Sequence, residues 1–204
     1  SAMIFPATAE EWKSDTEWIK PSVGDPGPAG GPPADAIVLF GGKDMSAFVG
    51  GENWKLAEGY VVADKGGITH KQPFGSCQLH LEFASPLEDK DPGQGRGNSG
   101  IYLMGRYEVQ ILDSPWGPAD HRECGAIYGV APPRVNAARE SQRWQSYLIH
   151  IQQPLLDETE TKSSPAVLTV YHNGILIHDQ QLFDAMSVKN SLGFIERRTD
   201  RYRN

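Results

Sequence analysis

The feature that most constrains the fold is an Asn-Gly dipeptide between two runs of strand-forming residues. In VLTVYHNGILIHD (167–179), Asn173 and Gly174 separate two stretches rich in Val, Ile and Leu. Asn-Gly is a preferred pair for the type I′ turn, whose twist matches that of two antiparallel strands. We therefore predict a β-hairpin here, with antiparallel neighbours around it.

Strand patterns recur along the rest of the chain. Apolar and polar residues alternate in CQLHLEFA (77–84) and YLIHIQ (147–152), which is typical of strands with one buried face. AIVLF (36–40) predicts another strand, and WKLAEGYVVAD (54–64) predicts two short ones around Glu58-Gly59. No segment has a long helical apolar period, and 22 glycines and 15 prolines supply turns. The pattern predicts an all-β antiparallel sandwich or barrel.

The N-terminal part has a different composition. Residues 21–34 read PSVGDPGPAGGPPA, which is too rich in proline and glycine for regular structure. We predict an arm, with a short helix or extended segment over 5–20, and a strap up to residue 35. One domain follows over 36–204. Ser1-Ala2-Met3 is typical of a cloning remnant, so we expect that an export signal has been removed.

Composition excludes several classes of function. The net charge is -7, with acidic and basic residues interspersed, which argues against a nucleic-acid partner. No apolar run approaches the roughly 18 residues that a membrane span needs. Cys77 and Cys124 lack the spacing of a zinc site, and the sequence leaves open whether they form a disulfide or two thiols.

The stretch NSGIYLMGRYEVQILD (98–113) predicts a second hairpin, connected at Gly105-Arg106. On its second arm Glu108 and Gln110 share one face, because side chains alternate along a strand. A polar pair in an apolar strand indicates either a solvated face or the floor of a polar cleft. Asp113 has the opposite parity and faces Glu108 only if a β-bulge intervenes.

Several motifs in this order resemble the 3-keto-disaccharide hydrolase family of the concanavalin A-like lectin and glucanase superfamily. They are NSGIY, YEVQILD, GAIYG (125–129) and APPRVNA (131–137), with further matches at LFGGKDMSAF (39–48), RWQSYLIHI (143–151) and VYHNGILI (170–177). The similarity covers about residues 36–195. It implies a concanavalin-like jelly roll of two curved antiparallel sheets with a sugar site on the concave one. It also implies an exported, extracytoplasmic protein that acts on glycosides oxidised to a ketone at C3.

Cleavage of such a glycoside needs a base near C2, a donor near the C3 oxygen and an acid for the leaving group. Glu108 is the candidate base, and Asp113 and His121 are the other candidate catalytic residues. The candidate substrate-binding residues are Asn98, Tyr102, Gln110, Trp116, Tyr128, Asn136 and Trp144. For Trp144, core packing is the alternative, and Trp54 is expected in the core. Four other histidines, His80, His150, His172 and His178, are expected on outer faces.

Two other functions stay open. A non-catalytic carbohydrate-binding module is one, because the family's HG loop has no counterpart in the C-terminal LGFIERRTDRYRN. A retaining glucanase is the other, and it needs the carboxyls of Glu108 and Asp113 about 5–5.5 Å apart.

No cofactor is predicted with certainty. A divalent cation such as Ca²⁺ fits the resemblance, with Asp89 and Asp91 as candidate ligands. The expected partner is a glycoside or oligosaccharide.

Overall fold

The computed structural model describes residues 19, 24–87, 93–105, 107–156, 158, 162–183 and 194–196. The chain divides into two compact units, residues 1–38 and 39–204. The described part of the first unit consists of turns, for example one closed by a 2.9 Å bond from Gly31 N to Pro28 O. The arm predicted over 5–20 lies, except for Ile19, outside the described residues, and so do residues 197–204.

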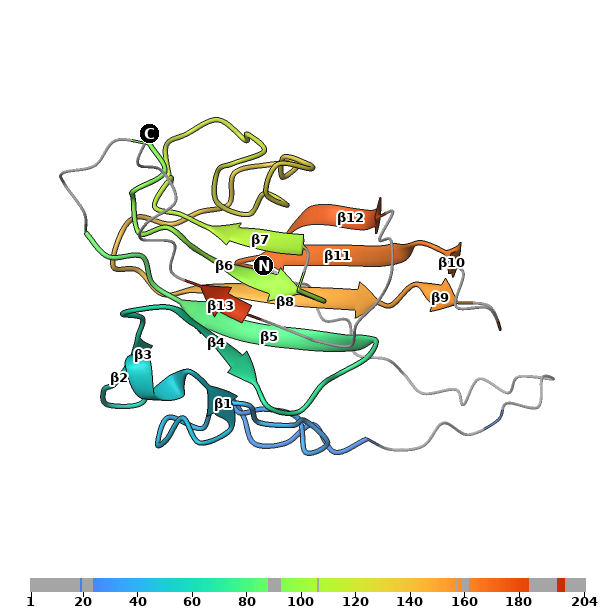
Figure 1. Ribbon diagram of the computed structural model, residues 1–204, viewed down its shortest axis with the longest axis horizontal. Helices are drawn as coiled ribbons and strands as arrows, with labels where there is room; N and C mark the ends of the chain where they lie inside the picture. The colour runs from blue at the N-terminus through green and yellow to red at the C-terminus, as the bar shows by residue number, and fades with distance from the viewer. Residues whose placement is uncertain are drawn as a thin grey trace, which may run out of the picture. The chain divides into compact units, whose positions relative to one another are not determined.

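The second unit contains two main antiparallel sheets (Figure 1). One has five strands in the order β1 (Phe48–Val49), β4 (Gly67–His70), β13 (Phe194–Glu196), β6 (Ser99–Leu103) and β7 (Tyr107–Ile111). The other has four, in the order β12 (Ile175–Phe183), β11 (Ala166–His172), β8 (Gln145–Gln152) and β5 (Cys77–Phe83). Every pairing is antiparallel. Both predicted hairpins are present, and Asn173 and Gly174 have the positive φ angles of a type I′ turn.

Shorter elements complete the unit. These are the ribbons β2 (Lys55–Leu56) with β3 (Val61–Val62) and β9 (Leu155–Leu156) with β10 (Lys162–Ser164), and the 3-10 helix η1 (Gly51–Asn53). The two strands predicted around Glu58-Gly59 are therefore confirmed. The strand predicted over 36–40 is wrong, because that segment pairs with no strand, and Ile37 and Val38 are largely exposed. A segment of apolar residues becomes a strand only when a neighbouring strand is in place to hydrogen-bond with its backbone, and composition does not determine that.

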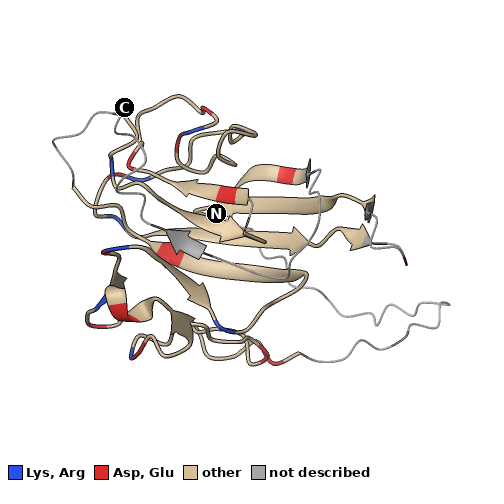
Figure 2. Cartoon of the chain, in the orientation of Figure 1, with Lys and Arg blue, Asp and Glu red and all other residues tan. Residues whose placement is uncertain are grey.

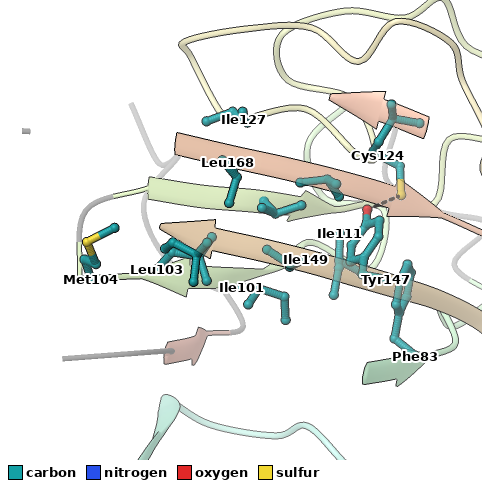
Figure 3. Close-up of a cluster of buried hydrophobic side chains, with 14 of the residues drawn as sticks. Phe83, Ile101, Leu103, Met104, Ile111, Cys124, Ile127, Tyr147, Ile149 and Leu168 are labelled. Carbon is teal, nitrogen blue, oxygen red and sulfur yellow. Dashed lines mark hydrogen bonds between the residues drawn. The ribbon is translucent and has the colours of Figure 1, made fainter. Parts of the chain in front are cut away.

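The core lies between the two main sheets (Figure 3). The five-stranded sheet contributes inward residues such as Ile101, Leu103 and Val109, and the four-stranded sheet contributes residues such as Ile149 and Leu168. In β8 and β11 every second side chain is buried, as the alternation in the sequence predicted. Burial of these two faces against each other is the main stabilising contribution. The predicted all-β jelly-roll sandwich is confirmed.

Two histidines correct the prediction that this group lies on outer faces. His172 is fully buried because it shares the parity of Leu168 and Val170 on the inward side of β11. Its Nε2 lies 2.9 Å from Gln145 Oε1. His178 is also buried, with Nε2 2.7 Å from Gly125 O; the pairing of β11 with β12 shifts register nearby, so strict alternation fails there.

The other outer-face histidines fit the prediction better: His80 is exposed on β5 and His150 is half-buried on the outer side of β8. Trp54 is buried, as expected, and its indole N–H donates to Gly66 O. Cys77 and Cys124 are free thiols, which resolves the question of the disulfide. Among the described residues, no helix is long and apolar enough to cross a membrane.

Candidate functional site

The hairpin of β6 and β7 positions the polar residues that the sequence singled out. Its register is unbroken from Ser99 opposite Ile111 to Leu103 opposite Tyr107. With Ile101 and Val109 directed into the core, alternation directs Gly100, Tyr102, Glu108 and Gln110 to the opposite face. We call these four residues the carboxylate face. The hairpin turns through Met104 and Gly105, which both have left-handed backbone angles.

Glu108 is a buried carboxylate in the middle of this face, and only 4% of it is exposed. It is the one acidic residue of β7, visible as the band on that strand in Figure 2. The hydroxyl of Tyr102, its cross-strand partner, donates to Oε2 of Glu108 at 2.9 Å. Because the donor comes from the residue paired with Glu108 on the neighbouring strand, this contact fixes the orientation of the carboxyl group.

Gly100 is the part of the face that makes room for Glu108. A Cβ at residue 100 would lie 2.8 Å from Cδ of Glu108 and closer still to its Cγ and Oε1. Real Cβ atoms do not approach other atoms so closely, so any side chain here would displace the carboxylate. The glycine of the NSG motif is therefore a packing requirement of Glu108.

Gln110 and Asn98 are buried, and their amide N–H groups are used inside the protein. Nε2 of Gln110 donates to Gln94 Oε1 at 3.2 Å and to Arg122 O at 3.4 Å. Nδ2 of Asn98 donates to Gln94 O at 2.8 Å. The carbonyl oxygens of both side chains are buried without a hydrogen-bond partner among the described atoms. The two amides thus join the hairpin to the segment that carries Gln94.

Asp113 lies beyond the end of β7 and is held by other partners than Glu108. Its backbone N donates to Arg96 O at 2.8 Å, and its Oδ2 accepts a 2.7 Å bond from the Ser141 hydroxyl. Because the register of β7 is unbroken, no bulge within the strand turns Asp113 toward Glu108. The geometry does not favour the carboxyl pair of a retaining glucanase.

The segment after Asp113 covers β7 without forming a strand. GAIYG (125–129) does not form a strand; within it Ile127 makes isolated bridges, to Val109 and Ala131. The left-handed angles of Gly125 and Gly129 interrupt an extended conformation. Tyr128, half-buried, donates its backbone N–H to Glu108 O at 2.9 Å, which brings it beside the candidate base.

His121 lies on the surface of the same segment. Its side chain is 48% exposed, and Nδ1 lies 3.3 Å from Oδ1 of Asp120. Its backbone oxygen accepts a hydrogen bond from Gly129 N. The structure therefore gives His121 a carboxylate neighbour in solvent.

Trp116 and Trp144 lie in a second region. They line an open groove of about 640 Å³ together with Pro115, Ala138, Arg139, Glu140, Gln142 and Arg143, and we call it the tryptophan groove. Trp116 is 84% exposed and Trp144 49%, so core packing of Trp144 is ruled out. Trp144 precedes the buried Gln145 at the start of β8, and alternation turns it outward. None of the lining residues belongs to β6 or β7.

Asn136 holds the loop that carries Trp116. Its Nδ2 donates to Ser114 O at 2.8 Å and to Gly117 O at 2.9 Å, on either side of Trp116. Its Oδ1 accepts a bond from Ala138 N at 3.0 Å. All hydrogen-bonding groups of this amide are thus engaged in bracing the groove, a role distinct from the sugar contact that the sequence suggested.

The metal prediction has no counterpart in the described part of the chain. No group of three or more His, Cys, Asp or Glu side chains gathers there in a way that suits a metal ion. Asp89 and Asp91 lie outside the described residues, so a Ca²⁺ site in their loop stays a prediction.

Several residues of both regions escaped the sequence analysis. Three of them act through contacts with residues that are distant in sequence or on the paired strand, and no local sequence pattern predicts such contacts. They are Gln94, Gly100 and Ser141. Arg139 and Arg143 are different, because their closeness in sequence to Trp144 was a usable signal.

Comparisons with known proteins place the chain in the class of carbohydrate-active, glycosyl-hydrolase-like β-sandwiches. A solved structure from Parabacteroides distasonis ATCC 8503, named as a candidate glycosyl hydrolase, is similar with a TM-score of 0.78 and 32% identity over 90% of this chain and 87% of that one. The chain belongs to the family described as the 3-keto-alpha-glucoside-1,2-lyase-like domain, whose sequence model matches residues 35–198. This match confirms the family resemblance that the sequence motifs indicated.

Two further structures from the same organism, named in the same way, share the fold. Their TM-scores are 0.58 and 0.51 at 17% and 18% identity, covering 78% and 77% of this chain and 86% and 87% of theirs. A comparison with curated proteins gave no match.

Proposed function

We propose that this chain cleaves 3-keto-glycosides by removing the C2 proton, eliminating the C1 substituent and adding water, with Glu108 as the base. The observation that carries the proposal is the buried Glu108 carboxylate, held by the Tyr102 hydroxyl above Gly100. Membership of the family supports the substrate class.

The chemistry needs one well-placed base. The C3 ketone acidifies the C2 proton, and its removal places the electron pair in an enolate. The enolate then re-forms the ketone and a C1–C2 double bond while the bond from C1 to the leaving oxygen breaks, and that oxygen takes up a proton. Water adds at C1, a proton returns to C2, and the balance is a hydrolysis. A positioned base of this kind contributes typically 10²–10⁴-fold.

The remaining candidates take supporting roles in this proposal. Tyr102 positions Glu108 rather than the sugar, and Tyr128, whose backbone bonds to Glu108, is the candidate donor to the C3 oxygen. Asn98 and Gln110 are buried and bonded to Gln94, so in this proposal they support the carboxylate face rather than contact the sugar. Asp113 and His121 are the candidate acids for the leaving group. An extracytoplasmic location stays a prediction.

A second candidate function is carbohydrate binding without cleavage. It is favoured by the contrast between the buried Glu108 and the exposed rings of Trp116 and Trp144, which line a groove of their own. Exposed aromatic rings offer flat apolar surfaces of the kind that pyranose faces cover. In that case the carboxylate face is structural, and the groove carries the function.

The test is release of sugar from a 3-keto-disaccharide, measured with wild type and Glu108→Gln. We expect the variant to lose about 10²–10⁴-fold in rate, because the amide cannot accept the C2 proton. Glu82→Gln, an exposed glutamate on β5, is the matched control and should keep the wild-type rate. Retained turnover in Glu108→Gln would contradict the assigned base.

A second readout separates elimination from direct hydrolysis. In D₂O the proposed route places deuterium at C2 of the product, beyond the exchange of product incubated alone. Cleavage without deuterium at C2 would instead indicate glucanase-type chemistry. Glycan binding with no turnover by wild type would support the binding module.

A further inference from the structure

We infer that the tryptophan groove binds saccharides that carry an anionic group, a carboxylate or a sulfate. The inference rests on the carbohydrate role proposed above but not on Glu108 or on cleavage. It commits the groove to one occupant, an acidic sugar unit, and three features of the described residues support it.

The first feature is the charge of the groove. Arg96, Arg122 and Arg134 each have a carboxylate partner, at 3.1, 3.7 and 3.4 Å. Arg139 and Arg143 have no such partner within the described part of the chain, and both line the groove. In a protein of net charge -7, the groove thus holds two guanidinium groups, four positions apart in sequence, that form no ion pair among the described residues. Guanidinium groups match the geometry of carboxylate and sulfate oxygens.

The second feature is that Glu140, the acidic residue of the groove, forms no ion pair with either arginine in the described part of the chain. Its described contact with Arg143 is through the backbone, from Arg143 N to Glu140 O at 3.2 Å. Arg139 uses one N–H, donating from Nη1 to Trp144 O at 3.0 Å, which ties it to the ring-bearing residue. A guanidinium has five N–H donors, so most remain for a ligand.

The third feature is the preorganised aromatic surface. Asn136 bonds the loop of Trp116 on both sides, and the ring of Tyr60 packs edge-on against Trp144 with centroids 5.7 Å apart. A loop backbone fixed at Trp116 and a ring contact at Trp144, both present before binding, reduce the entropy lost when a sugar stacks on the rings. A neutral saccharide would use the rings and leave both arginines unpaired, and an acidic peptide would use the arginines and lack a pyranose face. An acidic sugar uses both.

The experiment compares three disaccharides of one backbone by calorimetry: a neutral one, one with a uronate and one with a sulfate. We expect at least one anionic disaccharide to bind wild type about tenfold tighter than the neutral one at low salt, with the difference reduced by screening near 0.5 M salt. The anionic form that binds tighter identifies the source of the charge. Equal affinity for all three, or no binding, would overturn the inference.

Variants locate the effect. Arg139→Gln/Arg143→Gln should bind the anionic disaccharide no better than the neutral one, while Arg134→Gln, an exposed arginine outside the lining, should keep the tenfold preference. Preference retained in the double variant would also overturn the inference. Binding is measured in parallel with Glu108→Gln, which should bind like wild type. Failure of cleavage with an intact anionic preference would therefore count against the proposed function alone.

Discussion

The carboxylate face and the tryptophan groove are built in opposite ways. The carboxylate face lies on two regularly paired strands, and its polar side chains are buried and bonded to protein partners. The tryptophan groove is formed by segments that lack regular strand structure apart from their junction with β8, and its two rings are exposed. Strand pairing therefore fixes the Glu108 carboxylate, whereas the loops present exposed aromatic rings.

The difference shows which interactions each region depends on. Glu108 depends on cross-strand neighbours at fixed register, Tyr102 beside it and Gly100 beneath it. Trp116 depends on hydrogen bonds from the Asn136 side chain to loop carbonyls. A change in one region should leave the other intact, and the following predictions test that independence in order of expected size.

Gly100→Ala should break the carboxylate face. The added methyl overlaps Glu108, so we expect a loss of about 100-fold in turnover, as for a misplaced catalytic group. Overpacking should also lower the free energy of unfolding by about 1–3 kcal/mol. Sugar release and chemical denaturation measure the two effects.

The matched control is Gly117→Ala in the loop of Trp116. A Cβ there would lie 3.5 Å from Glu123 Oε2, an ordinary contact, and Gly117 lacks a positive φ. We expect turnover close to wild type. If Gly117→Ala lost as much activity as Gly100→Ala, the steric explanation would be wrong.

Acid should weaken the core on which the carboxylate face rests. Tyr147 donates to the backbone of Gln110 at 2.7 Å and packs against His172, with ring centroids 4.7 Å apart. Burial, aided by the positive charge of Arg139, lowers the pKa of His172 to about 4. Burial also lowers the pKa of His178.

The direction of this pH effect on stability follows from proton uptake by His172 in the unfolded chain. Above pH 6.5 the imidazole of His172 is neutral in both states, and its contribution to stability is complete. Between pH 6.5 and 4 the unfolded chain binds a proton that the folded chain does not, so stability falls as the pH falls. We expect a loss of about 2 kcal/mol at pH 5 from this group.

Urea denaturation at pH 7.5 and pH 5 measures this loss. His172→Gln should show a smaller difference between the two pH values than wild type, and His121→Gln, in the exposed loop, should show the wild-type difference. An unchanged difference in His172→Gln would contradict the assignment.

Asn136→Ala should weaken the groove and spare the carboxylate face. It removes two donors and one acceptor, so we expect a loss of about 1–3 kcal/mol in stability and several-fold weaker glycan binding. Turnover per folded molecule on a small 3-keto-disaccharide should change least. Calorimetry and denaturation report the effects, with exposed Asn53→Ala as control. Normal binding by Asn136→Ala would show that the Trp116 loop needs no brace.

How far the sequence predicts the fold depends on how local the signal is. The Asn173-Gly174 turn, the alternation in 77–84 and 147–152 and the 98–113 hairpin all describe neighbours along the chain, and all are present. The predicted strand over 36–40 and the predicted outer-face position of His172 were wrong, because the first depended on a pairing partner and the second on which face of the sheet became buried.

The sequence by itself determined the antiparallel sandwich and the shared face of Glu108 and Gln110, because period-two patterns and turn residues act over a few residues. The family followed from the resemblance of several motifs in their order along the chain. Only the tertiary structure decided which polar side chains form hydrogen bonds within the protein. The side chains of Gln110 and Asn136 hydrogen-bond to other segments of the chain, and Gly100 leaves the space that Glu108 occupies. Arg139 and Arg143 line the same groove as two exposed tryptophans. Such roles arise from contacts between distant segments, and these exist only once the sheets have packed.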